Sequence, residues 1–335
     1  MNLPPIVRGL LWPVSLLYGG GARLRAWLYG HGWLKRKRLK APVISVGNLS
    51  VGGTGKTPMV IWLAEQLLAD GKRIAILSRG YRGSNGTSDE IELMKLRLQG
   101  RVAFGVGKDR FEEGKRLESD GAIDFFLLDD GFQLLELARD VDILLIDASR
   151  PLRKESLLPA GRLREPLSAI HRADLVVFTR VNDQPGVKRA IQEFPEFPIF
   201  HAATRLLRYR RLGTSQEAFS AMELPPQPVF VFCGIGNPDA FLADVERWGN
   251  VVVGRAVYRD HHSYSEQDAR RMEESARKAG ARSLLTTEKD VQNLGDLRFV
   301  ALPAYYCEIE VKIADTAEFR KTLTSKLLAR QGAAA

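Results

Sequence analysis

The stretch VISVGNLSVGGTGKTP at residues 43–58 constrains the fold more than any other part of the chain. A short apolar run leads into a glycine-rich loop that ends in Gly-Lys-Thr, and apolar residues at helical spacing follow until Gly71. A strand, a loop and a helix in this order are typical of a phosphate-binding loop, where backbone amides and the helix N-terminus hold phosphates. A glycine-rich turn with an incidental lysine would explain only the loop.

The loop departs from the pattern G-x-x-x-x-G-K-[ST] at its first position, where Ser50 replaces glycine. The glycines that remain still allow positive φ angles and a close approach to a ligand. In such loops the lysine reaches the β- and γ-phosphates and the hydroxyl binds Mg²⁺. We expect the phosphates of ATP to be held by eight consecutive residues: Ser50, Val51, Gly52, Gly53, Thr54, Gly55, Lys56 and Thr57.

Further apolar runs predict a mostly parallel sheet flanked by helices. They lie at residues 72–78, 122–130, 141–149 and 173–180, with helical segments between them. After the proline-rich residues 223–228, strands are expected within 228–237, 249–258, 281–290 and 298–306, with helices near 238–248 and 265–279. Because 335 residues exceed the usual size of one core, we predict an N-terminal region at 1–41, a P-loop NTPase-like domain at 42–220 and a smaller α/β lobe at 221–335.

The positive charge is concentrated at one end of the chain. Residues 1–41 contain eight lysines and arginines and no acidic residue, so the other 294 residues carry +1 of the net +9. A nearly neutral body argues against a nucleic-acid partner. The two cysteines, Cys233 and Cys307, have no metal-type spacing, which suits a reducing compartment.

The same N-terminal region carries the longest apolar segment. Its 14 residues between Arg8 and Arg23 fall short of the roughly 20 that a membrane-spanning helix needs. Leucines at helical spacing, interleaved aromatic residues and the KRKRLK run predict an amphipathic helix on an anionic membrane surface, divided into pieces by Pro13 and by Gly19 to Gly21. A signal peptide and a soluble helix packed on its own domain are the alternatives.

Carboxylates that follow two of the apolar runs are candidates for a Mg²⁺ site. Asp129 and Asp130 close the run at 122–130, before Gly131 and Gln133, and Asp147 closes the run at 141–149. Which of the three binds the metal stays open, because carboxylates in such positions are also common helix caps.

Two polar segments could act on an acceptor hydroxyl. The glycine-rich loop after residue 78 contains Arg79, Arg82, Asp89 and Glu90, at the carboxyl end of a strand where open α/β sheets bind ligands, although a solvated surface loop would look the same. In the second half, Asp260, His261 and His262 lack a third zinc ligand, which favours an acid/base or orienting role. The TTEKD segment at 286–290 is a further polar strand exit, or an ordinary helix N-cap.

The motifs GGTGKTP, SRGYRG, SDE, LLDDGFQ, GRLREPL, GIGNPDAF, DHHSY and TTEKD occur in the order found in tetraacyldisaccharide 4′-kinases, and the chain resembles this family over nearly its whole length. The resemblance implies an ATP-dependent transferase of lipid A biosynthesis. Its reaction would phosphorylate the 4′-hydroxyl of a tetraacylated glucosamine disaccharide 1-phosphate, a glycolipid. The enzyme would lie at the cytoplasmic face of the bacterial inner membrane, as a peripheral or monotopic protein.

The resemblance also implies roles for individual residues. Asp89 matches the general base, His261 its partner, and Lys56 the phosphate-binding lysine. The expected Mg²⁺ ligands are Thr57, Glu90, Asp129 and Asp130. The side chains expected near the substrate headgroup or nucleotide are Arg82, Arg110, Gln133, Arg164 and Glu165.

Two residues depart from the family pattern, since Ile91 replaces a proline after the DE pair and Leu134 replaces a histidine after DDGFQ. A different class also remains open, a membrane-associated regulatory ATPase acting on a protein partner. Its loops read GGxGKT as well, but they carry a lysine where this chain has Val51. A binding module whose basic N-terminus recruits an acidic partner is a third possibility.

Overall fold

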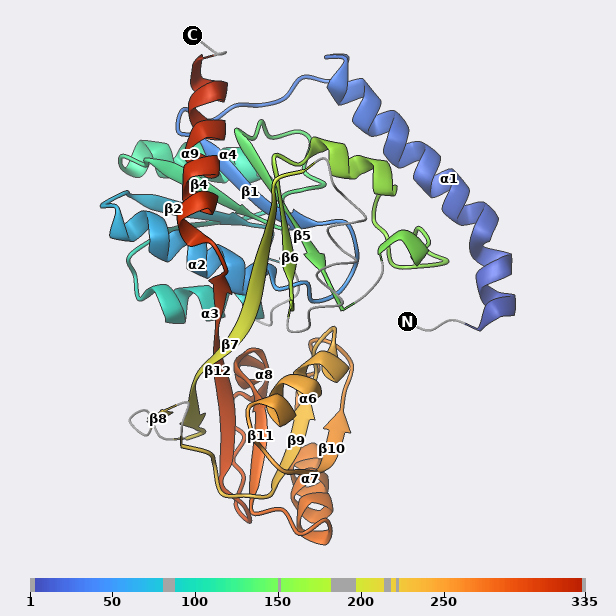
Figure 1. Ribbon diagram of the computed structural model, residues 1–335, viewed down its shortest axis with the longest axis vertical. Coiled ribbons are helices and arrows are strands. Elements are labelled where there is room, and N and C mark those ends of the chain that lie inside the picture. Colours follow the sequence, from blue (N-terminus) through green and yellow to red (C-terminus); the bar gives the residue numbers. More distant parts are fainter. Residues whose placement is uncertain are drawn as a thin grey trace. The chain divides into compact units, whose positions relative to one another are not determined.

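The computed structural model describes residues 4–80, 88–149, 152–181, 197–213, 218–220 and 223–332, which belong to two compact units (Figure 1). Unit 1 comprises Met1–Tyr81, Leu98–Ala203 and Val311–Ala335, and unit 2 comprises Arg82–Arg97 and Thr204–Glu310. Each unit is assembled from separate stretches of the chain. The linear ranges 42–220 and 221–335 therefore remain a proposal about domains, not a description of these units.

Unit 1 is built on parallel strands in the order β7-β6-β5-β1-β4-β2-β3. Their bounds are β1 Val43–Asn48, β2 Ile74–Ser78, β3 Ala103–Val106, β4 Phe125–Asp129, β5 Val141–Asp147, β6 Leu175–Thr179 and β7 Ile199–Arg211. In the central register, Ile44 of β1 lies opposite Leu127 of β4 and Val141 of β5. The four parallel strands expected from the apolar runs between residues 72 and 180 are confirmed.

Helices cover both faces of this sheet, which explains why β1, β2, β4 and β5 are apolar with little alternation. On one face, Val43, Leu77 and Phe126 pack with Leu117 of α4 (Arg110–Asp120). On the other, Trp62 of α2 (Lys56–Ala69) meets Phe319 of α9 (Thr316–Gly332) in an edge-to-face contact. Because all strands are parallel, the segments after β1, β4, β5 and β6 emerge at one edge of the sheet.

Unit 2 is a smaller α/β layer structure. Its strands β9 (Val229–Cys233), β10 (Val252–Val257), β11 (Ser283–Thr287) and β12 (Ala304–Ile313) pair in the parallel order β10-β9-β11-β12. Consecutive residues of β9 pack against different helices, because their side chains point to opposite faces of the sheet. Val231 packs against α6 (Pro238–Arg247) and Phe232 against α7 (Glu266–Lys278). The helices α3 (Asp89–Leu98) and α8 (Glu288–Leu294) and the short strand β8 (Ala218–Ser220), antiparallel to β7, complete the unit.

Most elements of the second half agree with the sequence analysis, with one shift. The strand expected within 298–306 begins only at Ala304 and continues to Ile313. Val300 before it is 90% exposed, so the apolar residues at 299–301 are not a buried strand. The helices near 238–248 and 265–279 are α6 and α7, and both start at side-chain caps, Asn237 and Ser265.

The N-terminal helix α1 (Pro5–Gly30) is continuous over 26 residues, so the prediction that Pro13 and Gly19 to Gly21 divide it is wrong. Pro13 removes only one backbone donor, and contacts with the rest of unit 1 support the helix before the glycines, through Ser15 and Tyr18, and after them, through Arg25, whose Nη1 donates to the carbonyl of Gln133. Ser15 Oγ accepts from the amide of Ala160, and Tyr18 Oη donates to the carbonyl of Arg164. Within the described ranges, no helix combines the length and hydropathy that crossing a membrane requires.

Candidate active site

The phosphate-binding loop lies between β1 and α2, as predicted. Gly52 and Gly55 adopt φ angles of 108° and 86°, the left-handed region that glycine enters at no steric cost. The loop is held from both sides: the amide of Val51 donates to the carbonyl of Arg162, and Thr179 Oγ1 donates to the carbonyl of Thr54. Thr57 is the second residue of α2, so the amides of the loop end at the positive end of a helix.

Lys56 faces the segment that follows β4. Its Nζ lies 3.4 Å from Asn48 Oδ1 and 3.6 Å from Asp130 Oδ1. Asp130 has a φ of 52°, uncommon for a residue with a side chain, which turns the carboxylate back toward the loop. Burial raises the pKa of Asp130, but the charges of Lys56 and Arg164 outweigh it, and the pKa is lowered overall. Asp130 is therefore held as a carboxylate.

Arg164 connects the LREP run to the DDGFQ segment. Its Nη1 donates to both carboxylate oxygens of Asp130, at 2.8 and 2.7 Å, and to Gln133 Oε1 at 3.3 Å. Gln133 in turn donates to the carbonyl of Asn48 at the end of β1. The structure thus brings together four residues expected at the site from the sequence: Lys56, Asp130, Gln133 and Arg164. Asp129, the last residue of β4, precedes Asp130, and its Oδ2 accepts from Ser78.

Glu165, the next residue, points away from this group. Its side chain is 8% exposed, and both of its oxygens accept from Arg172, at 2.7 and 2.9 Å. Arg172 also donates to the carbonyl of Phe132 and lies over its ring. Glu165 therefore supports the DDGFQ turn through Arg172.

Arg82 and Arg110 are the other arginines expected near the substrate. Arg82 lies outside the part of the chain that the structure describes. Arg110, the first residue of α4, is buried, and its Nη1 donates to the carbonyl of Lys108. Burial lowers the pKa of Arg110, and the charge of Arg79 lowers it further, while Asp130 acts in the opposite direction.

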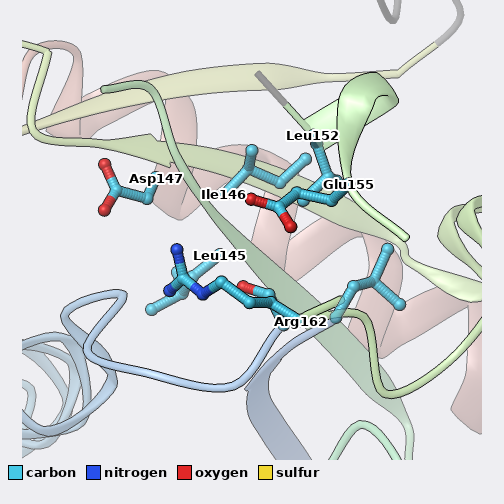
Figure 2. A pocket seen from close by; sticks show the side chains of 8 residues that line it. Leu145, Ile146, Asp147, Leu152, Glu155 and Arg162 are labelled. Carbon is cyan, nitrogen blue, oxygen red and sulfur yellow. The ribbon is translucent and has the colours of Figure 1, made fainter. Parts of the chain in front are cut away.

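Asp147, the third candidate for the metal site, has different partners. Its Oδ1 accepts from the amide and hydroxyl of Ser149, and its Oδ2 lies 3.0 Å from Nη1 of Arg180, at the end of β6. Asp147 also lines a cavity of ≈ 20 Å³, room for about one water, beside Ser50, Glu155 and Arg162 (Figure 2). The cavity is too small for a nucleotide, and Asp147 serves as an anchor for Arg180.

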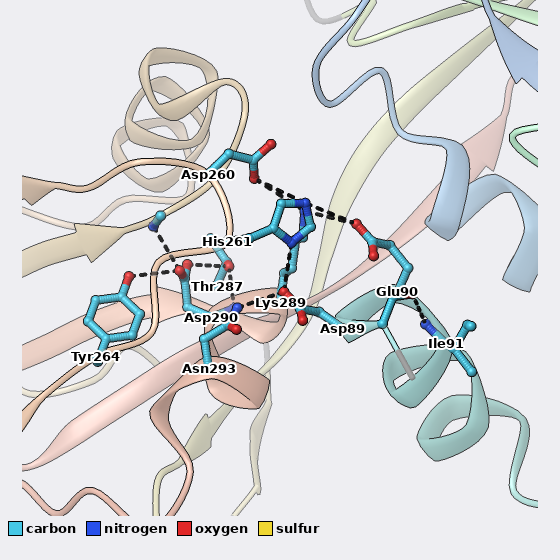
Figure 3. Close-up of polar contacts among 12 residues, drawn as sticks. Asp89, Glu90, Ile91, Asp260, His261, Tyr264, Thr287, Lys289, Asp290 and Asn293 are labelled. Carbon is cyan, nitrogen blue, oxygen red and sulfur yellow. Dashed lines mark hydrogen bonds and ion pairs between the residues drawn. The ribbon is translucent and has the colours of Figure 1, made fainter. Parts of the chain in front are cut away.

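Asp89, His261 and Glu90 come together in unit 2. His261 Nδ1 lies 2.9 Å from Asp89 Oδ2, with Asp89 at the first position of α3 and His261 in a strained backbone conformation, φ 61° (Figure 3). Burial raises the pKa of Asp89, but the hydrogen bonds from His261 and Asn293 lower it and together outweigh burial. The pKa of Asp89 is therefore below its usual value. The hydrogen bond to Asp89 raises the pKa of His261.

Glu90 is paired with Lys289 of α8, whose Nζ is 3.0 Å from Glu90 Oε1. The same ammonium lies 3.3 Å from Asp260 Oδ1 and 3.4 Å from His261 Nε2. Burial raises the pKa of Glu90, and Lys289 outweighs it, so the net shift is downward. No group of three or more His, Cys, Asp or Glu side chains able to hold a metal ion occurs among the described residues.

Both departures from the family pattern fit the core. Ile91 is fully buried in the first turn of α3, and its amide donates to Ser88, a bond that a proline could not make. Leu134 packs in the cluster formed with Val43, Leu77 and Phe126. Ile91 and Leu134 thus contribute apolar packing where the family has proline and histidine. The neighbouring Glu90 still pairs with Lys289, and Gln133 still donates to the carbonyl of Asn48.

Sequence reasoning missed several residues of these groups: Arg172, Arg180 and Asn293 were not singled out, and Lys289 was read only as part of a polar strand exit. Arg180 directly follows an apolar run, as Asp147 does, and that signal was available. No sequence signal marked Asn293, because its contact with Asp89 joins residues that are 204 positions apart in the chain.

The parallel sheet, the β1–loop–α2 unit and the polar strand ends define a P-loop nucleotide-binding protein of the α/β class. A family model described as tetraacyldisaccharide-1-P 4′-kinase matches residues 7–328, and the chain belongs to this family. It is 39% identical over 333 residues to the tetraacyldisaccharide 4′-kinase of Geobacter metallireducens, covering 93% of this chain and 96% of the relative. It is 34% identical over 331 residues to that of Desulfotalea psychrophila, covering 91% and 93%.

A solved structure agrees with this assignment. LpxK from Aquifex aeolicus, determined in complex with ATP, superposes with a TM-score of 0.75 at 32% identity, covering 96% of this chain and 99% of that one. The fold class and the predicted kinase of lipid A biosynthesis are confirmed, and the regulatory ATPase is not favoured.

Proposed function

We propose that this chain transfers the γ-phosphate of ATP to the 4′-hydroxyl of a tetraacylated glucosamine disaccharide 1-phosphate. The observation that carries the proposal is the pairing of Asp89 with His261 at 2.9 Å, in a family whose members are named for this reaction. A carboxylate held ionised by a histidine is suited to accept the proton of an alcohol. The loop at residues 50–57, at a helix N-terminus, is suited to bind the phosphates of ATP.

The residues present also fit Mg²⁺, which prefers few carboxylates and hydroxyls and completes its ligands with water and phosphate oxygens. Thr57, Asp129 and Asp130 supply such oxygens in unit 1. We assign these three residues to the metal, while the assignment of Glu90, in unit 2, rests on the family resemblance alone. When bound, Mg²⁺ neutralises charge on the phosphates and draws the γ-phosphate into position.

In the chemical step, Asp89 takes the proton of the 4′-hydroxyl as the sugar oxygen forms its bond to the γ-phosphorus. The bond between that phosphorus and the β–γ bridging oxygen breaks, and ADP leaves with the electron pair. Lys56 neutralises the charge that builds on the leaving oxygens. His261, paired with Asp89, keeps the base oriented and stabilises its charge before transfer.

Arginines around Asp130 would bind the anionic groups of the substrates. Arg164, with Gln133, lies on the carboxylate of Asp130, and Asp130 is one of the charges that oppose the lowering of the Arg110 pKa. Guanidinium groups bind phosphate oxygens well because their donors are arranged as a fork. We assign Arg110, Arg164, Gln133 and, by resemblance, Arg82 to the nucleotide or headgroup, with Glu165 acting through Arg172.

The glycolipid requires the enzyme to work at a lipid surface, and α1 fits that task. Ser15 and Gly19 of this helix are buried, while its exposed large apolar side chains include Ile6, Leu10, Trp12, Val14, Leu16, Leu17, Leu24 and Trp27. An exposed apolar helix beside a basic run binds anionic membranes without crossing them. We propose that α1 holds the protein at the cytoplasmic face of the inner membrane. Since Tyr18 and Arg25 contact the carbonyls of Arg164 and Gln133, α1 is also tied to the proposed site.

The test is transfer of labelled phosphate from ATP to tetraacyl disaccharide 1-phosphate in detergent micelles. Lys56→Ala and Asp89→Asn should each abolish the labelled lipid, whereas the control Lys278→Ala should not, because Lys278 is 75% exposed and pairs with Glu274 on the surface of α7. ATP binding should survive in Asp89→Asn and weaken in Lys56→Ala. Full transfer by Asp89→Asn would refute the assignment of the base, and no lipid product from the wild type would refute the function.

A further inference from the structure

Helix α8 makes more contacts with the Asp89 group than a capped polar turn needs. Thr287 is its N-cap and accepts from the amide of Asp290, so the interpretation of the TTEKD segment as a helix N-cap is confirmed. Beyond the cap, however, Lys289 and Asn293 project from the helix toward Asp89, Glu90 and His261 (Figure 3). These two residues lie four positions apart, on one face of the helix.

Asn293 acts directly on the proposed base. Its Nδ2 donates to Asp89 Oδ2 at 2.7 Å, the same oxygen that lies 2.9 Å from His261 Nδ1. Within the described part of the chain, no hydrogen bond to Asp89 Oδ1 is formed. Two donors on one oxygen fix the rotation of the carboxylate and leave Oδ1 as the oxygen with capacity to accept a further proton.

Lys289 acts on the partner of the base. Its ammonium can only donate, so at 3.4 Å from His261 Nε2 it favours the imidazole form in which Nε2 carries no proton and Nδ1–H points at Asp89. The ammonium also compensates the charges of Glu90 and Asp260, which both face His261. Lys289 thereby keeps a group of three carboxylates and one imidazole compact.

The helix is anchored well enough to do this. Asp290, almost fully buried, accepts from the amide of Gly234 at 2.7 Å and from Tyr264 at 2.8 Å. Glu288 accepts from Arg97, which lies at the end of α3. Arg97 also pairs with Glu308 of β12. Helix α3 is therefore fixed to α8 near both of its ends, by Arg97 and by Asp89.

We propose that Asn293, supported by Lys289, is a positioning residue of the phosphoryl transfer: it fixes Asp89 through Oδ2 so that Oδ1 receives the proton of the acceptor hydroxyl. The inference rests on the proposed function, because it concerns the base of that reaction. It predicts that removing the amide frees the rotation of the Asp89 carboxylate, and that the misoriented base lowers turnover without weakening the binding of ATP.

The experiment compares Asn293→Leu and Asn293→Asp with wild type and with the matched control Gln292→Leu, which changes the neighbouring amide that makes no bond to Asp89. We expect Asn293→Leu to lower kcat about tenfold to a hundredfold with KM for ATP unchanged, the scale of one hydrogen bond to a charged group. Asn293→Asp has the same shape but no donor for Asp89 Oδ2, so it should lower kcat at least as much.

A second readout needs no catalysis. Proton NMR of the five histidines at one pH, with His261 assigned by His261→Gln, should show changed chemical shifts for the His261 ring in Asn293→Leu, since the carboxylate that faces Nδ1 is then free to rotate. Melting temperatures separate these effects from misfolding. The proposal is overturned if kcat and the His261 chemical shifts of folded Asn293→Leu and Asn293→Asp equal those of wild type. If instead the wild type labels no lipid while the His261 shift is observed, the positioning stands and the proposed function fails.

Discussion

At the scale of single residues, three aspartates that look equivalent in the sequence have different partners. Asp129 and Asp130 follow β4 and Asp147 follows β5, yet Asp147 anchors Arg180 whereas Asp130 is bound by Lys56 and Arg164. A carboxylate beside the P-loop lysine can exchange an arginine contact for Mg²⁺, while one engaged by Ser149 and Arg180 is already satisfied. This contrast is our reason for assigning the metal to Asp129 and Asp130.

Arg164→Met tests the group around Asp130. The substitution keeps much of the apolar stem and removes the charge and the donors to Asp130 and Gln133. We expect kcat/KM for ATP to fall by about tenfold or more, the scale of a charge-assisted hydrogen bond. Arg270→Met is the matched control, because Arg270 is 81% exposed and pairs with Glu266 on the surface. Equal kinetics of the two variants would remove Arg164 from the site.

At the scale of elements, α1 contains one glycine at which a side chain would collide with Leu157 and neighbouring glycines at which it would not. A Cβ at Gly19 would lie 2.5 Å from Cδ1 of Leu157, whereas one at Gly20 meets nothing within 4 Å. Gly19→Leu should destabilise the docked helix by about 1–3 kcal/mol, as overpacking does. Gly20→Leu should stabilise by about 0.5–1 kcal/mol, through helix propensity. Thermal unfolding and proteolysis of α1 measure both, and a loss of stability in Gly20→Leu would contradict this packing.

Glu288 predicts how the stability of unit 2 depends on pH. Burial raises its pKa to about 7, Arg97 opposes this, and Glu308 adds to it. Since the folded-state pKa lies above the unfolded value near 4.5, keeping Glu288 ionised in the fold costs free energy at pH 8, and the cost disappears as the pH falls from about 7 to 4.5. The shift corresponds to about 3 kcal/mol at most.

Glu288→Gln, which cannot ionise, should therefore be more stable relative to wild type at pH 8 than at pH 5. Chemical denaturation at the two pH values measures this difference. The control Glu274→Gln changes an exposed carboxylate whose pKa is lowered by Lys278, and should show no such gain at pH 8. The Glu288 assignment fails if the difference between Glu288→Gln and wild type is the same at both pH values.

The same elements show what the sequence could predict. Strands such as β1, β4 and β5 are buried on both faces and appear as uninterrupted apolar runs, and caps such as Asn237 and Ser265 mark helix starts. The continuity of α1 was not predictable, because contacts such as that of Ser15 with Ala160 depend on tertiary structure. For the same reason P-loop residues were found by spacing, whereas Asn293, which has no motif of its own, was not.

At the scale of the whole molecule, the uneven distribution of charge and exposed apolar surface carries the last prediction. Eight of the nine net positive charges lie in residues 1–41, where α1 also exposes leucines and tryptophans. The protein should sediment with anionic vesicles and bind neutral ones less, and salt should weaken the binding because each nearby cation contributes about 1 kcal/mol. Leu17→Ser, at a side chain 78% exposed in the protein, should weaken vesicle binding severalfold because it removes one leucine that would be buried in the lipid.

Leu328→Ser is the matched control, an exposed leucine of α9 at 63%, outside the proposed membrane face. Both variants should keep wild-type turnover on substrate in detergent micelles, since neither residue belongs to the proposed site. On substrate embedded in vesicles, Leu17→Ser alone should lose rate, because fewer enzyme molecules are then at the surface where the acceptor lies. Equal vesicle binding by the two variants would mean that α1 serves the fold of unit 1 and that another surface brings the enzyme to its lipid.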